Sequence, residues 1–180
     1  MSKPEKPQPV LFFTGLLFDR TIPFEDIEEE LKSNFGEIDL IMDPVEFRWT
    51  EYYTPEMGEK LLRTWVSFEK LIMPDELIEK KHIAYEIEKS WANDGFKRRI
   101  NIDPGIMTPA KLILSTFKDF SHMIFLGDGV YAEVTLLFSG GDFKSLQWSF
   151  ADYRDIENQK FFHLMRNSLK QKIVDFKNLS

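Results

Sequence analysis

The chain has 180 residues with 30 acidic and 23 basic side chains, and its formal net charge is −7. Hydrophobic residues make up 43% of it, including 17 Phe, which is enough for a hydrophobic core and excludes a largely disordered chain. It has no cysteine, which excludes disulfides, thiolate catalysis, Cys-ligated zinc and iron–sulfur clusters. The acidic pI argues against DNA binding, and the lack of cysteine fits a cytoplasmic protein.

The N-terminus reads MSKPEKPQP and is polar and rich in proline. We expect residues 1–9 to be a disordered leader. The apolar run that follows, Val10–Phe18, is much shorter than the roughly 20 residues of a membrane helix, and the features of a signal peptide are missing. The sequence therefore predicts a single domain over residues 10–180 and no contact with a membrane.

The first half of the chain alternates between extended and helical patterns. The predicted elements are a strand at Val10–Phe18, a helix opened by Pro23 and ended by Gly36, extended segments at Glu37–Met42 and Val45–Tyr53, a strand at Leu61–Phe68, a helix from Pro74 to about Ala92 with a stop at Asn93-Asp94-Gly95, and a strand at Arg98–Ile102. This β-α-β-β-α-β order is that of a ferredoxin-like sandwich.

The second half predicts a different arrangement. Thr108-Pro109 is typical of a helix start, with a capping Thr followed by Pro, and indicates a short helix to about Phe117. Turns at Asp128-Gly129 and Gly140-Gly141 predict an antiparallel three-stranded meander. Its strands are expected at Ser121–Leu126, Val130–Phe138 and Phe143–Phe150, and a long C-terminal helix is expected from about Asp155. The predicted fold class is α+β.

Charge is distributed unevenly along the chain. Residues 1–96 carry 11 basic and 21 acidic side chains, whereas residues 97–180 carry 12 and 9. We therefore expect an anionic partner to meet the second half. Asp103-Pro104-Gly105 and the predicted helix start at Thr108 suggest an anion pocket, which would be completed by Arg98 and Arg99. Lys111 and Lys118, seven residues apart, would share a face of the predicted helix and add their charges to the pocket. The alternative is an ordinary turn beside a solvated basic surface.

The predicted register of the meander suggests an acid–base pair. With the two turns as assigned, one face carries His122, Tyr131, Glu133, Thr135 and Trp148. His122 and Glu133 become diagonal neighbours, about 7–8 Å apart between Cα atoms. A carboxylate beside an imidazole suits general acid–base catalysis, with a structural polar pair as the alternative. The opposite face is apolar and is expected in the core, with Met123, Phe125, Ala132, Val134, Leu136 and Phe138.

The candidate catalytic residues are therefore His122, Glu133 and Asp103, and the candidate ligand-binding residues are Arg98, Arg99, Thr108, Lys111, Lys118, Tyr131 and Trp148. The same His122, Glu133 and Asp103 are a weaker candidate for a metal site, but none of the three histidines has metal-ligand spacing, and no metal is predicted. Trp49, Tyr52 and Tyr53 beside Arg48 leave RNA binding as a further weak alternative.

Several runs of the sequence are similar to a known family. They are RRINIDPG at 98–105, the Thr-x-Ala-Lys-Leu-Ile-Leu run at 108–114, KDFSH at 118–122, GVYAEVTL at 129–136, Trp148, Asp152-Tyr153-Arg154, and earlier FTGLL at 13–17, FGEID at 35–39 and the segment Tyr52–Gly58. Together they resemble the bacterial domain-of-unknown-function family 4416 over nearly the whole chain. The resemblance implies a small soluble bacterial protein and brings no catalytic residues with it.

The sequence thus predicts a protein that binds a small anionic ligand, a nucleotide or a phosphorylated metabolite, near the Asp103–Lys118 segment. The alternative is a non-enzymatic protein-interaction module or a homo-oligomeric structural domain. The sequence does not identify a cofactor and leaves open whether a reaction is catalysed.

Overall fold

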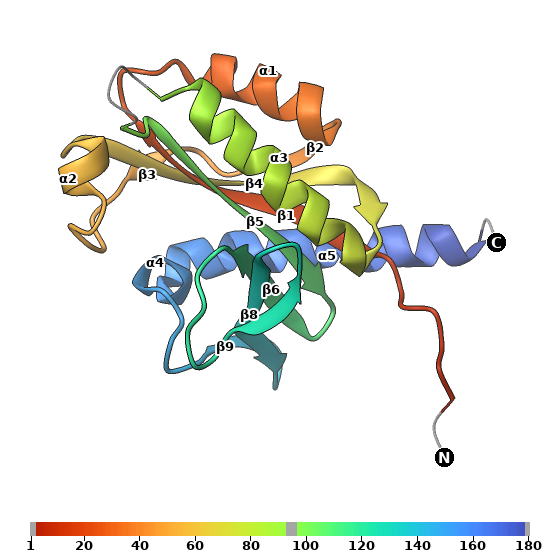
Figure 1. The fold of residues 1–180 in the computed structure, drawn as a ribbon. Coiled ribbons are helices and arrows are strands. Elements are labelled where there is room, and N and C mark those ends of the chain that lie inside the picture. Colours follow the sequence, from red (N-terminus) through yellow and green to blue (C-terminus); the bar gives the residue numbers. More distant parts are fainter. Residues whose placement is uncertain (1–2, 93–96, 179–180) are drawn as a thin grey trace.

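The computed structural model describes residues 3–92 and 97–178, and the predicted stop at Asn93-Asp94-Gly95 lies outside the described residues. One antiparallel sheet runs through both halves of the chain (Figure 1). Within the described residues its strands are β1 (Val10–Asp19), β2 (Ile38–Ile41), β3 (Val45–Glu46), β4 (Leu61–Ile72), β5 (Ile100–Thr108), β6 (Lys111–Thr116), β7 (Ile124–Gly127), β8 (Val130–Ser139) and β9 (Asp142–Ser145). Their order is β2-β4-β1-β5-β6-β8-β7, with β3 paired to β4 and β9 to β8.

The helices cover the sheet from both sides. They are α1 (Phe24–Phe35), α2 (Thr54–Met57), α3 (Leu77–Ser90), α4 (Ala151–Arg154) and α5 (Ile156–Asn178). In Figure 1, α1 and α3 lie on one face of the sheet and α5 runs along the other. The α+β class and the long C-terminal helix are confirmed, and the ferredoxin-like order of the first half stays a prediction. None of the helices in the described ranges has the length and apolarity that crossing a bilayer requires.

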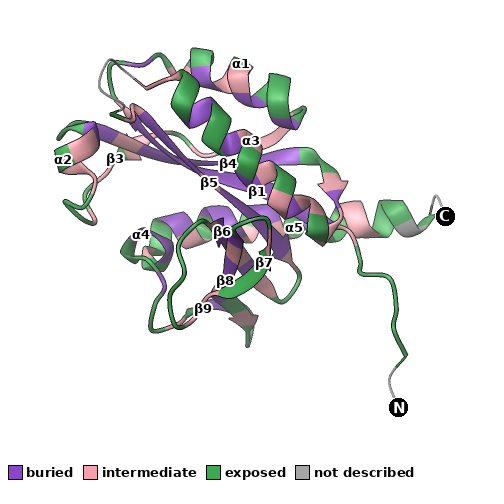
Figure 2. Cartoon of the chain, in the orientation of Figure 1, coloured by how far each residue is buried: buried purple, intermediate pink, exposed green. Residues whose placement is uncertain are grey.

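The central strand β1 is buried on both faces, which explains its continuous apolar sequence (Figure 2). Phe12 and Leu16 pack in the cluster that also holds the buried residues of α1 and α3. Leu11 and Phe13 point to the opposite face and pack in the cluster that holds the buried residues of α5. The alternation of strand side chains thus joins two cores across one sheet.

The predicted short helix after Thr108 is wrong, because the segment forms a β-hairpin. β5 continues to Thr108 and β6 begins at Lys111, and these two residues are paired across the turn. The Thr108 hydroxyl accepts hydrogen bonds from the backbone N–H groups of Ala110 and Lys111, both at 3.2 Å. Leu112 and Leu114 are buried with a partly buried residue between them. This period of two is typical of a strand, and it was a better guide to the structure than the helix start suggested by Thr108-Pro109.

The Asp103-Pro104-Gly105 run also differs from both sequence-based interpretations. It lies in the middle of β5 and is neither a turn nor a strand end. A Cβ at Gly105 would come within 2.4 Å of the Phe13 ring and 2.7 Å of the Ile113 carbonyl oxygen. Glycine is required here because the ring and the neighbouring strand approach the backbone closely.

The meander differs in register from its prediction. The Gly140-Gly141 turn is confirmed, since Ser139 pairs with Asp142, but β9 ends at Ser145 and does not extend to Phe150. β7 begins only at Ile124, and a register shift lies beside the Gly127–Val130 pair. The prediction that Phe125 lies in the core is wrong, because 60% of it is exposed on this short edge strand.

The segment predicted as extended at Val45–Tyr53 is a strand only over β3, and the short helix α2 that follows was not predicted.

Candidate functional site

A cavity of about 540 Å³ lies beside the central part of the sheet. Its walls are largely aromatic and come from both halves of the chain: Phe47, Trp49, Tyr52, Tyr53, Phe117, Phe120, Trp148, Phe150 and Tyr153. Its charged and polar lining includes Arg63, Lys81, Asn101, Asp103, Lys118, His122, Glu133 and Asp152. The three aromatic residues that suggested RNA binding, Trp49, Tyr52 and Tyr53, are therefore part of the cavity wall.

Arg63 of β4 forms the floor of the cavity. Its Nη2 lies 2.9 Å from Asp152 Oδ2 and its Nη1 3.4 Å from Asp103 Oδ2. The guanidinium also lies 4.6 Å from the centre of the Trp65 ring. Burial raises the pKa of the Asp152 carboxyl, and the positive charge of Arg63 opposes this rise. The buried cation thus lies between two carboxylates.

Gly15 on the neighbouring strand makes room for this arrangement. A Cβ at this position would lie 2.9 Å from the Tyr153 hydroxyl and 3.0 Å from Arg63 Nη2. The absence of a side chain in the middle of β1 therefore lets the guanidinium and the phenol lie against the backbone.

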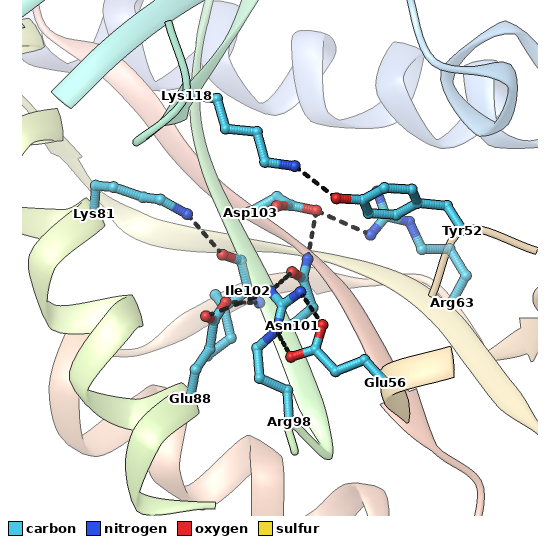
Figure 3. Close-up of polar contacts among 10 residues, drawn as sticks. All are labelled: Tyr52, Glu56, Arg63, Lys81, Glu88, Arg98, Asn101, Ile102, Asp103 and Lys118. Carbon is cyan, nitrogen blue, oxygen red and sulfur yellow. Dashed lines mark hydrogen bonds and ion pairs between the residues drawn. The ribbon is translucent and has the colours of Figure 1, made fainter. Parts of the chain in front are cut away.

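Asp103 is held by neighbours on the same sheet (Figure 3). Its Oδ2 accepts hydrogen bonds from Arg63 and from Asn101 Nδ2, the latter at 2.9 Å. Asn101 in turn accepts a hydrogen bond from Arg98 at 2.5 Å. Arg98 also donates two hydrogen bonds of 2.7 Å to the carboxylate of Glu56, and this contact lowers the pKa of Glu56. Arg98 is thus engaged in fixing Asn101, and through it Asp103.

Two lysines bring positive charge to the cavity. Lys118 is exposed at the mouth, where its Nζ donates to the Tyr52 hydroxyl at 3.0 Å and lowers the pKa of that phenol. Lys81 comes from α3, is buried, and donates to the Ile102 carbonyl at 3.3 Å. Within the described residues neither ammonium group lies within ion-pair distance of a carboxylate.

Glu88 lies on the same buried face of α3 as Lys81. Its carboxylate accepts a hydrogen bond of 2.6 Å from the Ile102 N–H. Burial raises the pKa of Glu88 to about 7, although the positive charge of Lys81 opposes the rise.

His122 and Glu133 are in direct contact, as the sequence predicted. His122 Nε2 lies 2.8 Å from Glu133 Oε2, and the Glu133 side chain is only 2% exposed. Thr135 donates to the other carboxylate oxygen at 3.2 Å. The imidazole stacks on Trp148, with ring centres 5.0 Å apart and planes 16° apart. The contact arises from the loop before β7, not from the predicted strand pairing, because His122 precedes β7. Its catalytic role stays a prediction.

The structure brings five of the predicted site residues to the cavity and leaves the others outside its lining. Asp103, Lys118, His122, Glu133 and Trp148 line it. The other described candidates lie outside the lining. Arg98 binds Glu56, and Arg99 donates a hydrogen bond to the Thr21 hydroxyl. Thr108 and Lys111 form the β5–β6 turn. Tyr131 packs on Phe125. The helix face that Lys111 and Lys118 were expected to share does not exist.

Sequence reasoning missed Arg63, Lys81 and Asp152. Two of these three residues carry a signal in the sequence that could have revealed them. Arg63 is a lone charge inside the apolar strand run LLRTWVSF, and Lys81 follows Leu77 by one helical turn on the buried face of α3. A buried charge needs a partner, so such positions point to a polar site. In the described parts of the chain, no group of three or more acidic or histidine side chains could hold a metal ion.

The chain belongs to the family described as "Domain of unknown function (DUF4416)", whose model matches residues 8–169. This confirms the family that the sequence motifs indicated. Neither the curated proteins nor the solved structures include a match to this chain.

Proposed function

We propose that this member of the DUF4416 family binds a small ligand that combines a planar ring with an anionic group, such as a nucleotide or an aromatic phosphate. The ligand would occupy the cavity above Arg63, with its ring against the aromatic walls and its anionic group near Lys118 and Lys81. The observation that carries the proposal is the presence in an aromatic cavity of two lysines, neither of which lies within ion-pair distance of a described carboxylate.

The size and lining of the cavity support this proposal. Small-molecule sites in proteins are mostly apolar pockets of about 300–1,000 Å³ with a few convergent polar groups. The cavity of about 540 Å³ lies within this range. Aromatic side chains offer flat surfaces for stacking and suit a planar ligand better than an aliphatic one.

The pairing of charges in the cavity favours an anion. Each carboxylate of the described lining already has a partner, since Asp103 and Asp152 face Arg63 and Glu133 faces His122. Lys81 and Lys118 donate hydrogen bonds only to neutral groups, a carbonyl and a phenol. A bound anion near them would add hydrogen bonds between two charged partners, which neither lysine forms with the described residues.

Thermal unfolding with three probes tests the proposal. Phenyl phosphate supplies a ring and an anion, inorganic phosphate only the anion, and benzyl alcohol only the ring. A ligand that binds only the folded state at a hundredfold excess over Kd stabilises it by about 2.7 kcal/mol. We expect the largest shift with phenyl phosphate, and we expect Lys118→Met to abolish it.

Lys111→Met is the matched control, because it removes the same charge from a residue outside the described lining. Equal binding of phenyl phosphate by the Lys118→Met and Lys111→Met proteins would contradict the proposed site. A flat response of the unmodified protein to a wider panel of aromatic phosphates and nucleotides would contradict the proposed function.

The alternative function, an interaction module or a homo-oligomer, is supported by a different surface. The edge strand β7 exposes Ile124, Phe125 and Leu126 side by side, and edge strands with exposed apolar residues are prone to pair with other chains. Light scattering after size-exclusion chromatography would test it. A dimer that Phe125→Lys converts to a monomer would favour this function.

We also propose three structural features of the chain. The order β2-β4-β1-β5, with α1 and α3 on one face, supports a ferredoxin-like first half. The continuous sheet supports a single domain over residues 10–180. Residues 3–9 form neither helix nor strand, in keeping with the predicted leader. A cytoplasmic location and a bacterial source stay predictions.

A further inference from the structure

We infer that the cavity hydrolyses a phosphodiester with an aromatic substituent, and that His122 is the general base that activates the attacking water. This inference rests on the proposed function, because the substrate would occupy the same cavity.

The hydrogen bonds of Glu133 define the protonation of the imidazole. Oε1 accepts from the Thr135 hydroxyl and Oε2 contacts His122 Nε2 at 2.8 Å. Burial raises the pKa of Glu133, and the hydrogen bonds from His122 and Thr135 oppose this rise. When the carboxyl is ionised, both of its oxygens are acceptors, so the proton of the second contact belongs to Nε2. In the neutral ring the other nitrogen, Nδ1, then carries the lone pair.

Nδ1 is the atom that His122 can offer to a bound molecule. Among the described residues, no side chain or backbone group forms a hydrogen bond with it. The side chain of His122 is 23% exposed and lines the cavity, and stacking on Trp148 fixes the plane of the ring. Glu133 is the positioning residue. It orients the imidazole, and its charge stabilises the imidazolium that forms when Nδ1 takes a proton.

The charges of the cavity favour a phosphodiester over a carboxylic ester. A phosphodiester carries its negative charge at the reacting centre, where Lys118, Lys81 and the Tyr52 hydroxyl can stabilise it. A neutral carboxylic ester carries no charge before reaction, so the two ammonium groups would gain no ion pair from binding it. Asp103 and Asp152 both pair with Arg63, and Glu133 contacts His122, so no carboxylate of the described lining forms an ion pair with the two lysines.

The reaction needs only water as co-reactant. One O–H bond of water breaks as its proton moves to His122 Nδ1, and the water oxygen forms a bond to phosphorus. The bond between phosphorus and the aryloxy oxygen breaks, and the leaving aryloxide takes the proton back from the imidazolium. The products are a phosphomonoester and a phenol, and the imidazole is neutral again.

The test uses bis(4-nitrophenyl) phosphate and the absorbance of released 4-nitrophenolate. General base catalysis contributes about 10²–10⁴-fold to rate. We therefore expect His122→Gln to lower kcat by at least about a hundredfold. The same variant should still bind phenyl phosphate in the thermal unfolding assay, because the aromatic walls and Lys118 remain. Hydrolysis at the same rate in the unmodified and His122→Gln proteins would overturn the inference.

Glu133→Gln separates catalysis from folding. It should lower kcat with little change in KM, because the imidazole loses the carboxylate that orients it while the aromatic walls and Lys118 remain. An unchanged kcat would overturn the role of the pair. If phenyl phosphate binds but bis(4-nitrophenyl) phosphate is not hydrolysed, the inference fails and the proposed function stands. If phenyl phosphate does not bind either, both fail.

Discussion

Arg63 and Asp152 form an ion pair of 2.9 Å although they lie far apart in the sequence, and their side chains are only 4% and 8% exposed. The pair joins strand β4 to the short helix α4 beneath the cavity. It fixes Tyr153 and Asp152 against the sheet before α5 begins. The ion pair that lines the proposed site therefore also links the two halves of the chain.

Arg63→Met should destabilise the protein strongly. Removing one partner of a buried ion pair leaves an uncompensated charge and costs about 3–5 kcal/mol. The exposed pair of Arg20 and Glu46, with side chains 50% and 74% exposed, provides the control, since surface pairs contribute about 0–1 kcal/mol. Urea denaturation of the Arg63→Met and Arg20→Met proteins gives the comparison. Equal losses of stability in the two variants would show that the buried ion pair contributes no more to folding than the exposed pair does.

Gly105→Ala should also destabilise the fold. Its Cβ would lie 2.4 Å from the Phe13 ring and 2.7 Å from the Ile113 carbonyl oxygen, so the ring or the strand must move. Forcing extra atoms into a packed core costs about 1–3 kcal/mol. Because the closest atoms belong to the far side of the ring, adding Phe13→Leu should recover part of the loss. Chemical denaturation of the single and double variants measures this coupling, and strictly additive losses would contradict the proposed clash.

Glu88 should make stability depend on pH. Its pKa of about 7 in the folded protein lies above the ordinary value of 4.5, so between these values the folded state holds a proton that the unfolded chain has released. Stability therefore falls as pH rises from about 4.5 to about 7, by about 3 kcal/mol from this residue. Glu88→Gln keeps the acceptor for the Ile102 N–H and removes the titration.

Urea denaturation of both proteins at pH 5 and pH 8 checks this dependence. The Glu88→Gln protein should gain stability relative to the unmodified protein as pH rises, while groups common to both cancel. A difference between the two proteins that is the same at both pH values would show that Glu88 does not change its protonation on unfolding in this range.

The sequence predicted the elements whose signals are local and regular. The repeat of Ile27, Leu31 and Phe35 with a final Gly36 gave α1 correctly, and the Gly140-Gly141 turn set the β8–β9 register. The sequence-based prediction was wrong where a local turn or helix signal competed with strand pairing in the sheet. Thr108-Pro109 suits a helix start as well as a β-turn, and pairing with β1 and β8 decided the outcome.

Only the part of the site that lies close together in the sequence was predictable. His122 and Glu133 are eleven residues apart, and an approximate register was enough to bring them together. Arg63 and Asp152 meet through the pairing of β4, β1 and β5 and the path of the chain into α4, which no local pattern encodes. Lys111 and Lys118 were grouped by a helical period that β6 does not have.

The most direct test of the proposed cavity is the ¹H–¹⁵N spectrum of the four tryptophan indole groups during a titration with phenyl phosphate. Trp49 and Trp148 line the cavity, Trp65 lies beneath Arg63, and Trp91 lies outside the lining. Binding in the cavity predicts that the Trp49 and Trp148 signals shift with a common Kd, while the Trp91 signal stays in place. Shifts of Trp91 alone, or equal shifts of all four signals, would contradict the proposed site.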